Sequence, residues 1–314
     1  MTTPSDAMAE TDQAPRAGPP AALPATRPFY WSVRRELWEN RATYIAPLIA
    51  AGVVLFGFAI STINLPHNRR AVLALDPARQ GALVAMPYDF AAVAILLTGF
   101  IVGVFYCLGA LHNERRDRSI LFWKSLPVSD FTTVLAKAAI PLVVLPLVVF
   151  VTVVATQLIM LVMSAVVLAA NGMSVATPST PPLLQMSLVL LYGLAVIALW
   201  YAPIYGWLML VSGWARRTTF LWAFLPPLAL CLVEKIAFDT SHFASLLAYR
   251  LGGFWEAFTV HPRGGIGHAH PPQIGLEQLD PVRFLSTPGL WAGLAVAAAF
   301  LAAAVWQRRR REPI

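Results

Sequence analysis

Six long apolar stretches constrain what this chain can fold into. Crossing a bilayer takes about 20 predominantly apolar residues, and the 314-residue chain carries six stretches of that kind, with charged residues only at their ends. Inside lipid, every backbone polar group must be satisfied within the segment, which favours helices. The sequence therefore predicts an all-α integral membrane protein with six transmembrane helices, at residues 43–63, 90–111, 133–168, 183–211, 219–238 and 290–306.

Composition excludes a soluble domain. Hydrophobic residues make up 58% of the chain and charged residues 12%, against about 25% charged residues in a typical soluble domain. The net charge of +7 would also suit a nucleic-acid binder. Because the basic residues flank the apolar stretches, we expect the lipid bilayer, and no nucleic acid, as the partner.

The distribution of Lys and Arg predicts the orientation. With the N-terminus inside, sixteen of the 23 Lys and Arg residues fall in cytoplasmic segments and seven in external ones. Cytoplasmic segments of membrane proteins carry this excess. We therefore expect a multi-pass protein with both termini in the cytoplasm and an external segment at 239–288.

Two segments precede the first stretch. Residues 1–27 are rich in Pro, Ala, Asp and Thr and lack the apolar core of a signal peptide, which predicts a disordered cytoplasmic tail. Residues 28–41 predict a helix lying in the membrane interface, although an ordinary polar lead-in to a span is the alternative. Its apolar face holds Tyr30, Trp31, Val33, Leu37 and Trp38, and its polar face holds Ser32, Arg35, Glu36 and Glu39.

The loop 112–130, HNERRDRSILFWKSLPVSD, is dense in charges of both signs between two apolar stretches. It also places Phe122 and Trp123 outside the bilayer. Aromatic residues beside Arg are typical of protein contact surfaces, whereas a solvated basic loop would explain only the Arg residues. At its end, Ser129 or Asp130 is expected to cap the following helix.

Motifs for catalysis are missing. The sequence has no G-X4-G-K-[ST] phosphate loop, no H-E-X-X-H zinc motif and no G-X-S-X-G elbow. We expect no catalytic residues, no metal site and no cofactor in this chain, so ATP would have to act through another polypeptide. The segment 261–272 carries three His, but no Cys or carboxylate accompanies them as further ligands.

Few polar residues lie inside the apolar stretches. The most polar of them could either line a substrate pathway or form hydrogen bonds between helices. The aromatic residues of the fourth stretch could either line a pathway or belong to an interfacial aromatic belt. The pathway candidates are Thr152, Thr156, Gln157, Trp200 and Tyr205. Two Gly-X-X-X-Gly motifs, at Gly99/Gly103 and Gly289/Gly293, predict close helix packing.

The run Asn113 to Asp130, followed by Lys137, resembles the first cytoplasmic loop of the membrane (permease) subunit of bacterial type-2 ABC exporters, in which the ATPase is a separate protein. The interfacial helix, the six spans and the long segment before the last span fit the same resemblance. It implies an inner-membrane transport protein that is not itself an enzyme, and that pairs with a second permease subunit.

In that family the loop forms a coupling helix that docks on the ATPase, which binds ATP and Mg²⁺. The docking residues that the resemblance implies are Glu114, Arg115, Arg116, Asp117, Phe122, Trp123 and Lys124. A non-transporting membrane scaffold or assembly factor is the alternative, and an intramembrane enzyme is a further one. The sequence leaves open the substrate and whether the pair is a homodimer or a heterodimer.

Overall fold

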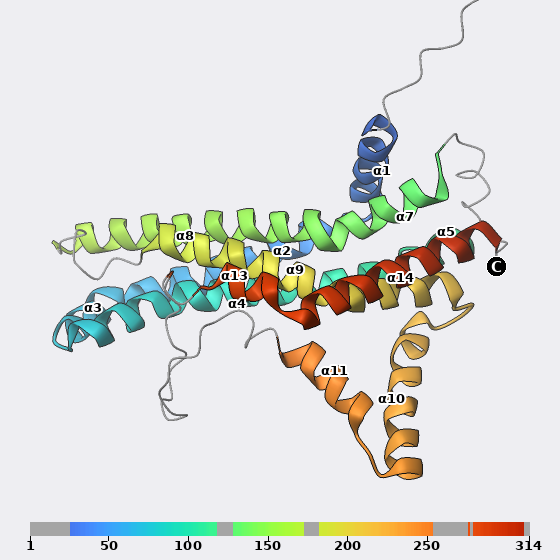
Figure 1. Cartoon of the computed structure of the whole chain (residues 1–314). Coiled ribbons are helices and arrows are strands. Elements are labelled where there is room, and N and C mark those ends of the chain that lie inside the picture. The colour runs from blue at the N-terminus through green and yellow to red at the C-terminus, as the bar shows by residue number, and fades with distance from the viewer. Residues whose placement is uncertain (1–25, 118–127, 173–181, 254–275, 277–278, 311–314) are drawn as a thin grey trace, which may run out of the picture.

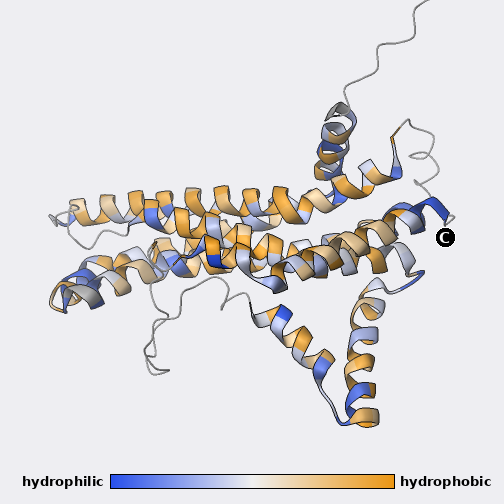
Figure 2. Ribbon diagram, in the orientation of Figure 1, coloured by the Kyte–Doolittle hydropathy of each residue, from blue (hydrophilic) through white to orange (hydrophobic). Residues whose placement is uncertain are grey.

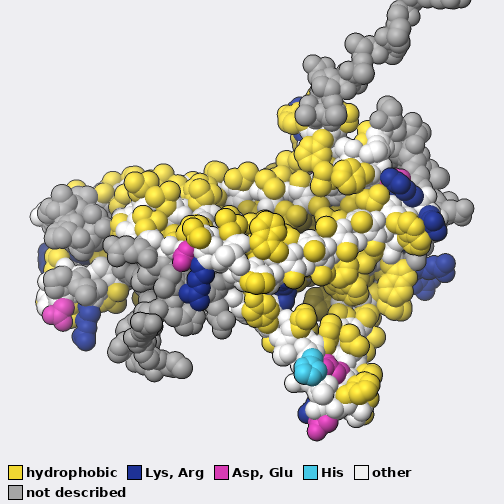
Figure 3. Space-filling model, viewed as in Figure 1, with side chains coloured by type: hydrophobic (Ala, Val, Ile, Leu, Met, Phe, Trp, Pro, Cys, Tyr) yellow, Lys and Arg dark blue, Asp and Glu magenta, His cyan; other side chains and the backbone are white. Residues whose placement is uncertain are grey.

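A computed structural model describes residues 26–117, 128–172, 182–253, 276 and 279–310, and within these ranges the regular elements are all helices (Figure 1). Six of them are long and apolar enough to cross a membrane, which confirms the predicted all-α, multi-pass fold. Hydrophobic residues predominate along most of the length of these helices, as Figure 2 shows. Figure 3 shows that Lys and Arg gather where the last span ends.

The six predicted spans are all present, but several are longer than their apolar cores. The first is α2 Ala42–Ser61, continued by a 3-10 turn Thr62–Asn64 and α3 Leu65–Leu73; the second is α4 Pro77–Gly109; the third joins α7 Asp130–Ala139, a π-helical turn Ile140–Val144 and α8 Leu145–Ala170; the others are α9 Leu183–Trp214, α10 Thr219–Phe238 and α14 Pro288–Arg310. Shorter helices are α1 Thr26–Glu39, α5 His112–Arg116, α11 His242–Gly252 and α13 Pro281–Ser286.

The third span is interrupted at its prolines. Its 41 residues would extend about 60 Å as one helix, twice the thickness of the hydrocarbon layer. Pro141 lies in the π-helical turn and Pro146 in the first turn of α8, where the missing proline N–H is tolerated. Beyond this turn α7 rises away from the axis of α8 (Figure 1).

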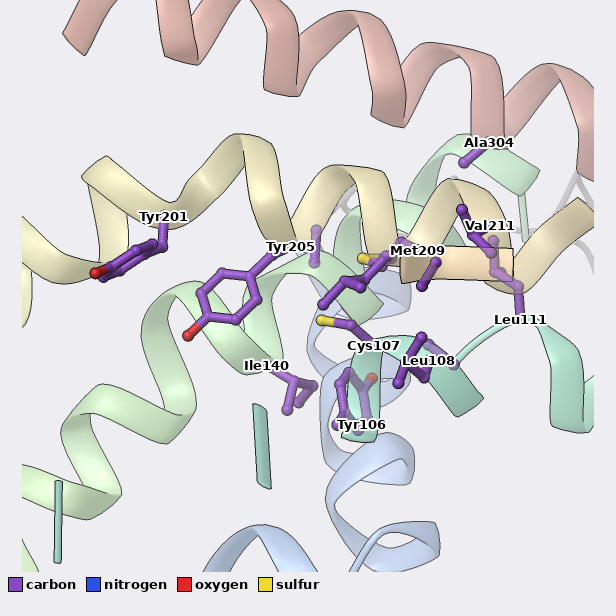
Figure 4. Packing of buried hydrophobic residues seen from close by; sticks show 14 of the residues in the cluster. Tyr106, Cys107, Leu108, Leu111, Ile140, Tyr201, Tyr205, Met209, Val211 and Ala304 are labelled. Carbon is purple, nitrogen blue, oxygen red and sulfur yellow. The ribbon is translucent and has the colours of Figure 1, made fainter. Parts of the chain in front are cut away.

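The first Gly-X-X-X-Gly motif packs helices together as predicted. Gly99 and Gly103 of α4 face Val149 and Leu145 of α8, and a Cβ atom at either glycine would crowd those side chains. The largest cluster of buried hydrophobic side chains among the described residues lies where α4, the π-helical turn, α9 and α14 meet. Figure 4 shows its side chains, among them Cys107, Ile140 and Met209, converging between the helices.

Helices α10 and α11 form a V that projects from the side of the bundle (Figure 1). The base of α10 rests on α9, because Trp222 packs on Trp214 with ring centroids 4.7 Å apart. The tip of the V is held by Glu234, whose carboxylate accepts hydrogen bonds from the backbone N–H groups of His242 and Phe243 at 2.7 and 2.8 Å. From there α11 returns to the middle of α9.

Helix α1 is present where an interfacial helix was predicted, but its polar face is oriented differently from our expectation. Tyr30, Trp31 and Trp38 are exposed, and Leu37 packs partly buried against the core. Ser32 and Glu36, expected on a solvated face, are buried against the bundle. Burial of the polar face has its physical reason in the ionic partners described next.

Candidate functional site

Six ionised side chains from four elements meet at one end of the bundle. We call this set the charge cluster; it consists of Arg35 and Glu36 of α1, Glu114 of α5, Asp130 and Lys137 of α7, and Arg308 of α14. Its three carboxylates are matched by three cations, so the cluster is formally neutral. The N-terminal helix and the end of the last span therefore lie at the same end of the molecule.

Lys137 is the centre of one half of the charge cluster. Its Nζ lies 2.8 Å from Oε1 of Glu36 and 3.2 Å from Oε1 of Glu114. Glu36 is 1% exposed and Lys137 is 2% exposed. The second carboxylate oxygen of Glu36 accepts a hydrogen bond from the hydroxyl of Tyr106 at 3.0 Å, so both oxygens of this buried group have partners, as burial of a charge requires.

Arg308 forms the other half. Its guanidinium pairs with Glu114 through one nitrogen and with Oδ1 of Asp130 through Nε at 2.9 Å. Glu114 lies just before the segment 118–127 and Asp130 lies just after it. The last span therefore joins the two flanks of this segment through one side chain.

The helix α5, which carries Glu114, is also fixed to α9. The hydroxyl of Ser212 accepts hydrogen bonds from the backbone N–H groups of Leu111 and His112, both at 2.9 Å. Arg115 donates to the carbonyl of Gly213 at 2.7 Å. The two bonds to Ser212 satisfy backbone donors that the start of a helix leaves unpaired, and all three bonds hold the first flank in place.

Charge balance keeps Glu36 ionised. Burial alone would raise the pKa of Glu36, but Lys137 and Arg35 outweigh burial and lower this pKa below its ordinary value. For Arg35, burial opposes the charged form, while the hydrogen bond and the charge of Glu36 raise the pKa. Both groups are therefore charged in the folded chain.

The predicted docking residues differ in their exposure. Glu114 and Arg115 are buried among intramolecular partners. Arg116 and Asp117 are exposed. Phe122, Trp123 and Lys124 lie outside the described residues.

The cap of α7 is resolved between its two candidates. Ser129 caps the helix, accepting from the backbone N–H of Thr132 at 3.0 Å. Asp130 is thereby left to bind Arg308.

The pathway candidates are not brought together. On α8, Thr152 and Thr156 donate to backbone carbonyls one turn earlier, and Gln157 donates to the carbonyl of Tyr88 on α4 at 3.3 Å. Trp200 and Tyr205 belong to the core shared by α4, α9 and α14. Gln157 thus makes a bond between helices, which was the alternative for the polar candidates, whereas the bonds of Thr152 and Thr156 stay within α8.

Sequence reasoning missed the pairing partners. Glu36 was placed on the polar face of an interfacial helix, Lys137 at the end of a span, and Arg308 in a basic tail. The available signal was Lys137 itself, a cation inside the long and largely apolar third span, since such a residue needs a counter-ion.

Among the described residues, no group of three or more His, Cys, Asp or Glu side chains is arranged to hold a metal ion. The His-containing stretch 261–272 lies outside them. Comparison with protein-family models, with curated proteins and with solved structures gave no match.

Proposed function

We propose that this chain is the permease subunit of an ATP-driven exporter, and that a separate ATPase docks on the segment 118–127. The observation that carries the proposal is the anchoring of both flanks of this segment. Glu114 and Asp130 bind the same Arg308, and Glu114 also shares Lys137 with Glu36. A displacement of the segment would therefore be transmitted to α1, α5, α7 and α14 together.

The transmission follows from the stiffness of buried ion pairs. A buried charge separated from its partner costs several kcal/mol, so the four elements move as a unit in preference to separating. An ATPase that closes on binding ATP would shift the equilibrium between two arrangements of the spans only if it binds one arrangement more tightly than the other. The charge cluster supplies a rigid connection for such contacts.

Further support comes from what the sequence contains. The six spans provide a membrane domain, and the chain lacks a phosphate-binding loop of its own, so the energy must come from a partner. The basic residues of both termini and of the segment 118–127 favour a cytoplasmic position for this end in the bacterial inner membrane. A second permease subunit completes the proposed assembly.

Copurification tests the proposal. A tagged chain should bring down a protein with ATPase activity, and Phe122→Ala together with Trp123→Ala should abolish its recovery while membrane insertion stays unchanged. Phe238→Ala with Trp291→Ala is the matched control, because it removes one Phe and one Trp that are exposed elsewhere on the chain. Undiminished recovery of the ATPase with the first double variant would contradict the proposal.

Labelling tests the orientation independently. A cysteine introduced at Ser119 should not react with a membrane-impermeant maleimide in intact cells. It should react once the cells are permeabilised and the reagent reaches the cytoplasmic face of the membrane. Cys107 is buried and Cys231 is half-buried, so a Cys231→Ala background removes the accessible native thiol. Reaction in intact cells would place the segment outside and exclude a cytoplasmic ATPase as its partner. ATP-dependent flux in reconstituted vesicles separates an exporter from a scaffold.

A further inference from the structure

Arg250, near the end of α11, is a cation in an apolar setting. Its guanidinium lies over the ring of Trp200, 4.8 Å from the centroid, and donates to the carbonyl of Gly289 at 2.9 Å and to that of Trp200 at 3.4 Å. Within the part of the chain that the structure describes, no carboxylate lies within ion-pair distance of Arg250. The carbonyl and ring contacts are with neutral groups, so no described residue compensates the positive charge of Arg250.

The helix end that carries Arg250 is fixed on the bundle. Trp200 Nε1 donates to the carbonyl of Arg250 at 2.9 Å, and the hydroxyl of Tyr201 donates to the carbonyl of Leu251 at 2.7 Å. These two bonds satisfy carbonyls that a helix C-terminus leaves unpaired. Contacts with α9 therefore fix the position of Arg250 against the bundle.

The second Gly-X-X-X-Gly motif accommodates this helix end. The sequence predicted close helix packing at Gly289 and Gly293, but the space above them is taken by two side chains of α11. A Cβ atom at Gly289 would meet the ring of Tyr249, and one at Gly293 would meet the guanidinium of Arg250. The motif thus leaves room for a cation.

Depth in the membrane follows from α14. Gly289 and Arg308 are 19 residues apart on this helix, which corresponds to about 29 Å. The hydrocarbon layer is about 30 Å thick. If Arg308 and the charge cluster lie at one boundary, Arg250 lies near the opposite boundary, where the headgroups of the other leaflet begin.

We propose that Arg250 binds the phosphate of an anionic amphiphile, such as an acidic lipid headgroup, at the end of α11. A guanidinium can offer several N–H donors to phosphate oxygens, and a charge near the membrane interior is costly unless it finds a counter-ion. Exposed apolar side chains of α11 and α14, among them Leu246, Leu251 and Trp291, accept the acyl part. This site does not depend on the exporter assignment.

Lipid binding to the full chain in a neutral maltoside detergent tests the site. Dioctanoyl phosphatidic acid and zwitterionic dioctanoyl phosphatidylcholine are titrated separately, and bound lipid is counted by native mass spectrometry. A hydrogen bond to a charged group contributes about 1.5–3 kcal/mol. Arg250→Gln should therefore weaken phosphatidic acid binding roughly 10- to 100-fold and change phosphatidylcholine binding little.

Two further variants make the test specific. Arg283→Gln removes an exposed cation on α13 and should leave both affinities unchanged. Gly293→Ala keeps the charge but places a Cβ atom where the guanidinium lies, so it should also weaken phosphatidic acid binding. It decides the matter if Arg250→Gln fails to fold.

Inorganic phosphate distinguishes the source of the anion. Displacement of phosphatidic acid by free phosphate would show that the anion alone is recognised, whereas retention would show that the acyl chains contribute. The proposal is overturned if the native chain binds both lipids equally, or if folded Arg250→Gln and Gly293→Ala retain the affinity of the native chain.

Discussion

The charge cluster makes a quantitative prediction for Lys137→Met. The substitution leaves the carboxylates of Glu36 and Glu114 facing each other where one ammonium group lies 2.8 and 3.2 Å from them. Removing one partner of a buried ion pair costs about 3–5 kcal/mol. We expect a loss of this size in the free energy of unfolding, because both carboxylates are nearly inaccessible to water, at 1% and 6% exposure.

A double-mutant cycle separates the ion pair from the loss of packing. Adding Glu36→Gln to Lys137→Met removes the uncompensated charge, and we expect the double variant to be more stable than the sum of the single effects predicts, by about 1–3 kcal/mol. Equilibrium unfolding in mixed micelles, followed by tryptophan fluorescence as the mole fraction of dodecyl sulfate increases, measures all four proteins.

Lys235→Met is the matched control. Lys235 pairs with Asp239 at 2.6 Å, but these side chains are 63% and 89% exposed, and exposed pairs contribute about 0–1 kcal/mol. Equal losses for Lys137→Met and Lys235→Met, or simple additivity with Glu36→Gln, would refute the claim that burial gives the charge cluster its strength.

Three further outcomes are expected from the same unfolding assay. Because the pKa of Glu36 is lowered in the folded chain, its contribution to stability is present above the ordinary carboxyl pKa of about 4.3. This contribution is lost as the pH falls through the lower, folded value, so Glu36→Gln should flatten the loss of unfolding free energy at acid pH. Gly99→Val should lower the free energy of unfolding by about 1–3 kcal/mol, because the new side chain overpacks against α8. Gly57→Val is the control, since nothing lies within 4 Å of a Cβ atom there, and it should change stability by less than about 1 kcal/mol. Equal effects of the two variants would contradict the packing argument. Ser212→Ala removes the acceptor of two backbone N–H groups and should cost about 1–3 kcal/mol, whereas an unchanged midpoint would show that these groups find other partners.

The sequence predicted the elements whose signal is local. Apolar length alone located α2, α4, α9, α10 and α14, because a segment in lipid must satisfy its own backbone. It could not predict how far α4 and the first span, which continues through α3, extend past their apolar cores, since those extensions depend on packing against neighbouring helices.

The charge cluster depends on contacts that no local pattern contains. Glu36 and Lys137 are 101 residues apart, and Glu114 and Arg308 are 194 apart. A helical wheel showed that Glu36 shares a polar face with Ser32, but the same wheel fits a face turned to water and a face turned to a buried lysine. In the same way, Gly289 and Gly293 indicated a close approach without indicating that a guanidinium would fill it.

The long sequence separation within the charge cluster also sets the order in which this end of the protein can be completed. Asp130 and Glu114 are synthesised 178 and 194 residues before Arg308, which binds both of them. At about 5–20 residues per second, these carboxylates wait roughly 10–40 s on the ribosome-bound chain. The bonds of Arg308 therefore form last at this end of the protein, after Glu114 has been able to pair with Arg35 and Lys137.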